Sequence, residues 1–305
     1  MNLVPAFFRL IRWPNLAFIL LTQVLFYSCV YMPLYGAHDY RKLIWLVFAS
    51  VCIAAAGYII NDYFDLNIDQ INKPGKNVFV KTLHRRWAIL WHFIFSLCGV
   101  IATGAALGLH KWYLVLANLF CVGLLWFYST SFKRNAIIGN FVISLLTAWT
   151  VLILFFAYTE PGEALTASNS TSVKFFRISF LYAGFAFVIS LIREAIKDMQ
   201  DIEGDEKYGC KTLPIIAGIR TTKIYTTVWI VVLTAALLVL QLYILQFGWW
   251  PAVIYSTILV IIPLFYVLHR LSKAKASKDF AYLSRLTKWI MLTGILSMVF
   301  FKIYF

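Results

Sequence analysis

The acidic residues of this chain gather in two short segments. Of its 13 Asp and Glu residues, nine lie within residues 62–69 and 194–206. In the first segment, Asn61, Asp65 and Asp69 are spaced i, i+4 and i+8, so on a helix they lie along one face. This spacing predicts a row of side-chain oxygens that points to one side.

The second segment repeats this arrangement. Asp198, Asp201 and Asp205 are spaced i, i+3 and i+7, and Glu194 extends the same face by one turn. Like charges at these spacings repel each other, and the cost rises near hydrocarbon, where a carboxylate loses water. A shared divalent cation offsets the repulsion, and Mg²⁺ binds carboxylates together with substrate phosphates. The two segments therefore predict a site for Mg²⁺ and a diphosphate between them.

The alternative is that these acids are only the solvated ends of membrane helices. A single acidic cluster would fit that interpretation equally well. Two matched clusters, with only four other acids in the chain, favour the metal and diphosphate site.

Basic residues flank both acidic segments. Diphosphate oxygens that no metal holds need cationic donors. Lys197 lies within the second segment, and Lys133 and Arg134 end the loop that begins at Tyr128, so we predict that these three cations bind the substrate. Other basic residues are interpreted as charges that orient the protein in the membrane: Arg85, Arg86, Lys207 and the run from Arg270 to Lys288.

Long apolar helices must position these residues. The chain has 305 residues, of which 62% are hydrophobic and 13% charged, and that is too little charge to cover a soluble domain. Apolar runs of roughly 17–25 residues, each long enough to cross a bilayer, recur along it. The sequence predicts an all-α membrane protein with about nine spans, at 13–34, 43–60, 88–109, 112–129, 137–158, 176–193, 224–247, 249–268 and 287–305.

The distribution of the basic residues accounts for the formal net charge of +14 without a nucleic-acid partner. With a cytosolic N-terminus, alternating sides place 21 of the 27 Lys and Arg residues in the cytosol, which is the positive-inside pattern. Both acidic segments then lie on the cytosolic side. The first apolar run is too long for a signal peptide, so we expect it to be retained. We expect a multi-pass protein of a bacterial or archaeal plasma membrane, in contact with membrane lipids.

At its acidic segments the chain resembles the UbiA superfamily of intramembrane prenyltransferases. Members carry an NxxxDxxxD motif, which matches Asn61, Asp65 and Asp69, and a DxxxD motif, which matches Asp201 and Asp205. The predicted spans fall where nine helices, with motifs after the second and the sixth, require. The resemblance therefore covers nearly the whole chain, and it implies helices arranged around a central cavity with the two motifs facing each other.

The resemblance also implies roles for individual residues within one transmembrane prenyltransferase domain, residues 1–305. The implied catalytic residues are Asp65, Asp69, Asp201 and Asp205. The implied Mg²⁺ ligands are Asn61, Asp65, Asp69, Asp198, Asp201 and Asp205. The implied substrate-binding residues are Asn61, Lys73, Lys76, Tyr128, Lys133, Arg134 and Lys197.

The stretch after the first motif departs from the family pattern. Many members continue as NKPxRP, whereas this chain reads Asn72-Lys73-Pro74-Gly75-Lys76-Asn77. Lys76 supplies the positive charge but not the bidentate fork of an arginine. A rearranged diphosphate contact is therefore expected at this position.

The implied reaction is Mg²⁺-dependent transfer of a prenyl group from a prenyl diphosphate. The motifs are most similar to the geranylgeranylglyceryl phosphate geranylgeranyltransferase branch, which implies a lipophilic or phosphorylated-glycerol acceptor. Three alternatives stay open at this point. An aromatic acceptor, as in quinone biosynthesis, uses the same donor. A cation or small-molecule transporter also carries membrane acids, although usually near the midplane. A purely structural membrane protein would leave the two acidic clusters unexplained.

Overall fold

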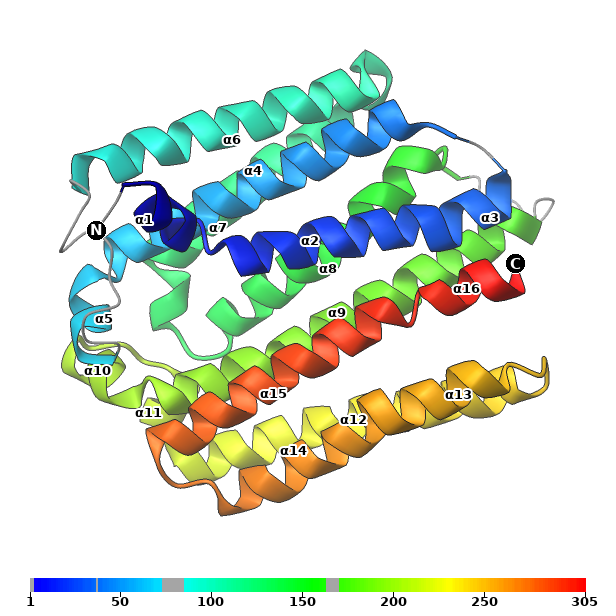
Figure 1. Ribbon diagram of the computed structural model, residues 1–305. Helices are drawn as coiled ribbons and strands as arrows, with labels where there is room; N and C mark the ends of the chain where they lie inside the picture. The colour runs from blue at the N-terminus through cyan, green and yellow to red at the C-terminus, as the bar shows by residue number, and fades with distance from the viewer. Residues whose placement is uncertain (1–2, 37, 73–84, 163–169) are drawn as a thin grey trace.

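The protein is a bundle of membrane-length helices (Figure 1). The computed structural model describes residues 3–36, 38–72, 85–162 and 170–305. Over these ranges, nine helices are long and apolar enough to cross a membrane, and no sheet forms; a lone parallel bridge joins Asn135 to Lys211. The all-α class and the predicted number of spans are confirmed.

The spans and the short helices have the following bounds. The first span consists of α2 (Trp13–Phe26) and α3 (Met32–Tyr35), which a π-turn (Tyr27–Tyr31) joins. The next spans are single helices: α4 (Tyr40–Phe64), α6 (Arg85–Leu107), α7 (Trp112–Thr130), α8 (Ile138–Tyr158), α9 (Ser170–Gln200) and α12 (Gly218–Leu245). The last two spans are α13 (Trp250–Ser256) joined by a π-turn (Thr257–Ile261) to α14 (Ile262–Lys273), and α15 (Ser277–Leu296) followed by α16 (Val299–Tyr304). The short helices outside the spans are α1 (Leu3–Leu10), α5 (Leu66–Asn72), α10 (Ile202–Lys207) and α11 (Leu213–Ile216).

Several spans extend beyond the apolar runs that predicted them. Helix α9 covers Ser170–Gln200, against a predicted 176–193, and α15 begins at Ser277, against 287. The added turns contain polar as well as apolar residues: in α15, Lys278 and Arg285 are exposed, whereas Phe280 and Leu283 are buried. The two helices pack together. At this contact the hydroxyl of Ser277 donates to the carbonyl of Gln200 at 2.9 Å. The apolar runs are therefore shorter than the helices, because the end turns of these helices contain polar residues.

The outer surface of the bundle is apolar. Leu242 is 71% exposed, Val239 67% and Phe120 66%. Side chains of this kind over whole helix faces would be unstable against water, but they are as stable in lipid as in a protein core. The surface therefore supports the membrane assignment.

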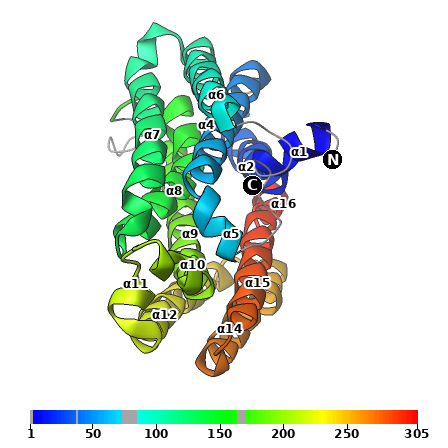
Figure 2. The same cartoon turned by 90° about the vertical axis from the view of Figure 1, so that its left-hand side faces the viewer.

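The two acidic segments lie at the same end of the bundle. The N-terminus, α1, α5, α10 and α11 gather at the left of Figure 1, and α5 and α10 lie side by side when this end is viewed directly (Figure 2). Six spans, α2, α4, α7, α8, α9 and α15, contribute residues to a central cavity that opens toward this end. Helices α6 and α12 pack outside that group, against α4 and α9 respectively.

At the opposite end, a buried lysine completes the last turn of α8. The Nζ of Lys111, whose side chain is 6% exposed, donates to the carbonyls of Phe156, Ala157 and Thr159 at 3.1, 3.0 and 2.7 Å. The last carbonyls of a helix have no partner within the helix and carry the negative end of its dipole. Lys111 therefore satisfies acceptors that would otherwise face the bilayer boundary unpaired.

We predict that Lys111→Met lowers the free energy of unfolding by about 2 kcal/mol, because three carbonyls lose a charged donor. Thermal unfolding of the purified protein in detergent measures the change. Arg177→Met, at an exposed position of α9, is the matched control and should change the melting temperature little. Equal melting temperatures for the two variants would contradict the assigned role of Lys111.

Candidate active site

Each acidic segment interrupts its helix at a single aspartate. Helix α4 ends at Phe64, Asp65 takes φ −85° and ψ 2°, and α5 then begins at Leu66. Asp201 takes φ −99° and ψ 10° in the same position between α9 and α10. The prediction of one continuous helical face through each segment is therefore wrong at these two residues. Both lie at the sparsely populated border between helical and extended conformation.

The turns on either side of each break nevertheless keep their helical spacing. The amide of Asp65 donates to the carbonyl of Asn61 at 2.9 Å, and the amide of Asp69 donates to that of Asp65 at 2.8 Å. The amide of Asp205 donates in the same way to the carbonyl of Asp201 at 3.2 Å. The motif residues therefore stay on one side of the chain although the helix axis changes direction.

A glycine allows the two segments to touch. The backbone amide of Gly204 in α10 donates to the Oδ1 of Asn72 in α5 at 2.8 Å. A Cβ on Gly204 would lie 2.5 Å from that oxygen, which is closer than real Cβ atoms approach. The contact joins Asn72, the last residue of α5, to the middle of α10 and fixes the relative position of the two helices.

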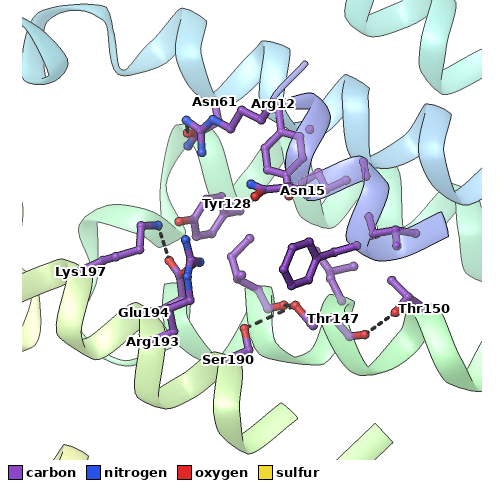
Figure 3. Close-up of a pocket in the computed structure, with 18 of the residues that line it drawn as sticks. Arg12, Asn15, Asn61, Tyr128, Thr147, Thr150, Ser190, Arg193, Glu194 and Lys197 are labelled. Atoms are coloured by element: carbon purple, nitrogen blue, oxygen red, sulfur yellow. Dashed lines mark hydrogen bonds and ion pairs between the residues drawn. The ribbon is translucent and has the colours of Figure 1, made fainter. Parts of the chain in front are cut away.

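One cavity of about 610 Å³ lies beneath these segments. Its acidic lining residues are Asp62, Asp65, Asp69, Glu194, Asp198, Asp201 and Asp205, and its basic ones are Arg9, Arg12, Lys133, Arg193, Lys197 and Lys288. Figure 3 shows Arg12 and the charged residues Arg193, Glu194 and Lys197 of α9, together with Asn61 of α4 and Tyr128 of α7. Both predicted acidic rows therefore line the same cavity.

Two of the acids are held by cations from outside the acidic segments. Lys133 forms an ion pair with Asp65, which is 4% exposed, and Arg12 forms one with Asp62. Burial alone would lower the pKa of Lys133 and of Arg12, but the neighbouring carboxylates outweigh it and raise the pKa of both groups. Both side chains are therefore cationic at physiological pH.

Local backbone geometry brings these two cations to the cavity. Arg12 lies between α1 and α2 in the left-handed conformation, with φ 51° and ψ 52°, and Pro14 follows in the first turn of α2. The turn that carries Lys133 (Phe132–Arg134) lies directly over the start of α8, where a Cβ on Gly139 would be 2.9 Å from the carbonyl oxygen of Phe132. A small residue at position 139 lets the Lys133 turn approach this closely.

The second acidic segment has its own polar partners. The carboxylate of Glu194 accepts hydrogen bonds from Arg193 at 2.9 Å and from Lys197 at 2.8 Å (Figure 3). The Nδ2 of Asn140 in α8 donates to Asp198 at 2.7 Å. These contacts fix Glu194 and Asp198 in place, so they distinguish the two acids from solvated helix ends.

Most of the residues predicted for the site line the cavity. These are Asn61, Asp65, Asp69, Tyr128, Lys133, Lys197, Asp198, Asp201 and Asp205. Arg134 is exposed and is not among the lining residues; its carbonyl accepts from the amide of Lys211 at 2.7 Å. Lys73 and Lys76 fall outside the described residues.

The sequence analysis missed several polar residues of the cavity. Arg12, Asn15 and Arg193 were not singled out, and Lys288 was assigned to the orienting charges of the membrane boundary. Lys288 in fact lines the cavity. One signal could have identified it, because a lysine within an apolar run is costly and therefore tends to be functional.

The residues of this cavity fit a Mg²⁺ ion that is held jointly with a diphosphate. Within the described residues, no three His, Cys, Asp or Glu side chains converge closely enough to hold a metal by themselves. Mg²⁺ sites of phosphate-transfer enzymes commonly use one or two carboxylates and complete the shell with phosphate and water. The Nδ2 of Asn61, buried and without a hydrogen-bond partner in the structure, is a donor available to a phosphate oxygen.

Away from the acids, the cavity lining is mostly apolar, with hydroxyl groups such as those of Thr147, Thr150 and Ser190 among the apolar side chains. Its deeper wall includes Ile53, Leu125, Leu146, Ile189 and Met291. A ligand that fits both parts has an anionic head and a long apolar tail.

Comparisons with known proteins agree with this geometry. Residues 17–295 match the sequence model of the UbiA prenyltransferase family. The digeranylgeranylglyceryl phosphate synthase of Thermococcus gammatolerans is 36% identical over 191 residues, which cover 61% of this chain and 60% of the relative. The matches span between 59% and 65% of the length of this synthase and of two further synthases of the same name.

Solved structures show that the fold extends over nearly the whole chain. The structure described as "Structural and mechanistic insights into the biosynthesis of Digeranylgeranylglyceryl phosphate synthase in membranes" superposes with a TM-score of 0.63 at 22% identity, covering 98% of this chain and 99% of the other. A UbiA homolog from Archaeoglobus fulgidus bound to DMAPP and Mg²⁺ superposes with a TM-score of 0.61 at 18% identity, covering 96% and 98%. The fold is therefore that of the UbiA homologues.

We predict that Gly204→Ala separates α5 from α10, because the new Cβ displaces the Asn72 side chain and breaks its hydrogen bond. The expected cost is about 1–2 kcal/mol. Adding MgCl₂ with inorganic diphosphate should raise the melting temperature of the wild type, and this rise should be smaller in the variant. Gly184→Ala is the control, since a Cβ there meets nothing within 4 Å. An undiminished rise in Gly204→Ala would contradict the role of this contact.

Proposed function

Because the chain belongs to the UbiA prenyltransferase family, we propose that it transfers a prenyl group from a prenyl diphosphate to an acceptor in the membrane, with Mg²⁺ as cofactor. One observation carries this proposal: two acidic segments from distant parts of the chain line the polar end of a single cavity whose deeper wall is mostly apolar. A transporter needs no such division into a polar head site and an apolar tail site.

The residues of the polar end bind and orient the diphosphate. Asp65 and Asp69 contribute carboxylates from one side, and Asp201 and Asp205 from the other. Mg²⁺ bound between them supplies a Lewis acid that offsets the charge developing on the diphosphate leaving group. Lys133 adds a cation from the loop between α7 and α8, where it is already paired with Asp65.

The apolar end protects the reacting carbon. When the allylic C–O bond breaks, the prenyl chain gains cationic character that water would quench. The apolar wall excludes water from this position, and the ring faces of Tyr128 and Phe18, which also line the cavity, can stabilise a cation. The oxygen of the acceptor hydroxyl then forms the new C–O bond and releases its proton.

We further propose geranylgeranyl diphosphate as the donor and geranylgeranylglyceryl phosphate as the acceptor. The names of the sequence relatives support this choice, as does the similarity of both motifs to that branch of the superfamily. The excess of Lys and Arg on the side of the acidic segments supports an active site on the cytosolic face.

We predict that Asp65→Asn and Asp201→Asn each lower kcat for prenyl transfer by at least roughly 100-fold, because each removes a carboxylate from the Mg²⁺ and diphosphate site. Release of diphosphate from geranylgeranyl diphosphate measures turnover. Glu203→Gln removes an exposed acid of the same segment that does not line the cavity, so it should keep kcat within about twofold. Turnover near that of the wild type in both aspartate variants would refute these roles.

Chelation tests the cofactor independently of any variant. EDTA should abolish turnover by the wild type, and excess Mg²⁺ should restore it.

A panel of acceptors then separates the candidates: transfer to geranylgeranylglyceryl phosphate supports the proposed acceptor, whereas transfer only to an aromatic acid would assign the chain to quinone biosynthesis.

A further inference from the structure

Lys288 is a cation of the cavity for which the described part of the chain supplies no acidic partner. Its Nζ donates to the Oδ1 of Asn15 at 2.6 Å and lies 5.0 Å from the centroid of the Phe18 ring. Among the described residues it forms no ion pair. An ammonium has three donors, and the bond to Asn15 uses one of them.

Lys288 lies close to a second cation of the cavity. Its charged neighbour is the guanidinium of Arg193, which forms an ion pair with Glu194 through Nη1. Glu194 is shared, because it also pairs with Lys197, so one carboxylate serves two cations. The Nε of Arg193 is buried and has no hydrogen-bond partner among the residues that the structure describes.

Two other cations of the cavity differ from Lys288, because each of them has an acidic partner. Lys133 is paired with Asp65 and Arg12 with Asp62. Among the described residues Lys288 forms no ion pair, and Arg193 shares the carboxylate of Glu194 with Lys197. Uncompensated charge in an apolar cavity is costly, so this pair is suited to a ligand that brings negative charge.

The position of Lys288 separates it from the diphosphate site. It lies 11 residues into α15, which is about 16 Å along the helix from its first residue. The motif aspartates Asp65 and Asp201 lie instead at the ends of their helices. An anion at Lys288 would lie beyond the diphosphate, toward the part of the cavity where the prenyl chain begins.

We propose that Lys288, Asn15 and Arg193 form a second anion site, which binds the phosphate of a phosphorylated acceptor. This inference rests on the proposed prenyl transfer. A phosphate monoester carries close to two negative charges at neutral pH, which matches two cations from α9 and α15 with donors still open. A neutral acceptor would leave Lys288 without a counter-ion, so the site selects against acceptors that lack the phosphate.

The experiment compares one acceptor with and without its phosphate. Initial rates are measured in lipid nanodiscs with geranylgeranyl diphosphate, Mg²⁺ and either geranylgeranylglyceryl phosphate or geranylgeranylglycerol. In Lys288→Met, the KM for the phosphorylated acceptor should rise roughly 10- to 100-fold. The KM for the alcohol and the KM for the donor should stay within about twofold of the wild type.

Two further variants make the result specific. Lys288→Arg keeps the charge and should restore most of the affinity for the phosphorylated acceptor. Lys278→Met removes an exposed lysine of the same helix that does not line the cavity, and it should leave every constant unchanged. Because Lys288→Met removes an uncompensated charge, its melting temperature should not fall below that of the wild type.

The outcomes distinguish this inference from the proposed function. If the wild type transfers prenyl groups to no acceptor, the proposed function itself fails. If the wild type is active but prefers the alcohol, or if Lys288→Met keeps the wild-type KM for the phosphorylated acceptor, the second anion site is overturned while prenyl transfer itself still stands. An equal rise in the KM for the donor would place Lys288 in the diphosphate site and would also overturn the inference.

Discussion

Seven carboxylates line one cavity at the end of an apolar bundle. The repulsion between them is the main constraint on the site, because the folded protein is stable only if positive charge offsets it. In the protein alone, part of that charge is balanced by ion pairs from outside the acidic segments, with Lys133 at Asp65 and Arg12 at Asp62. The remaining balance suits a divalent cation with a diphosphate, since hard cations favour carboxylate and phosphate oxygens together. The same electrostatic requirement therefore explains both the partners that the chain supplies and the ligands it is proposed to bind.

The geometry that answers this constraint comes from interrupting two long helices. A continuous α4 or α9 would carry its last acids away from the cavity along a straight axis. The break at Asp65 and the matching break at Asp201 turn α5 and α10 toward each other, and the contact between Gly204 and Asn72 holds them there. Both aspartates lie at the sparsely populated border of the helical region, where residues of functional sites are often found.

The cavity divides one substrate-binding space into three chemical zones. Acids and Lys133 occupy the outer end, Lys288 and Arg193 lie further in, and mostly apolar side chains line the deeper wall. Six spans supply these residues, while α6 and α12 pack behind them and present apolar faces outward. The outer helices thus present apolar side chains to the membrane, and the inner helices line the cavity.

The sequence alone determined the features that depend on local order along the chain. Apolar runs of membrane length gave the nine spans, and helical spacing gave the rows of acids, because both signals are periodic over a few turns. Only the tertiary structure decided which side chains meet. Lys288 and Asn15 are 273 positions apart, so no spacing could pair them. Lys133 and Arg134 are adjacent, yet a tight turn directs only the first into the cavity. Convergence of this kind depends on how helices pack and where they break, and those are set by contacts between distant segments rather than by the pattern of any one segment.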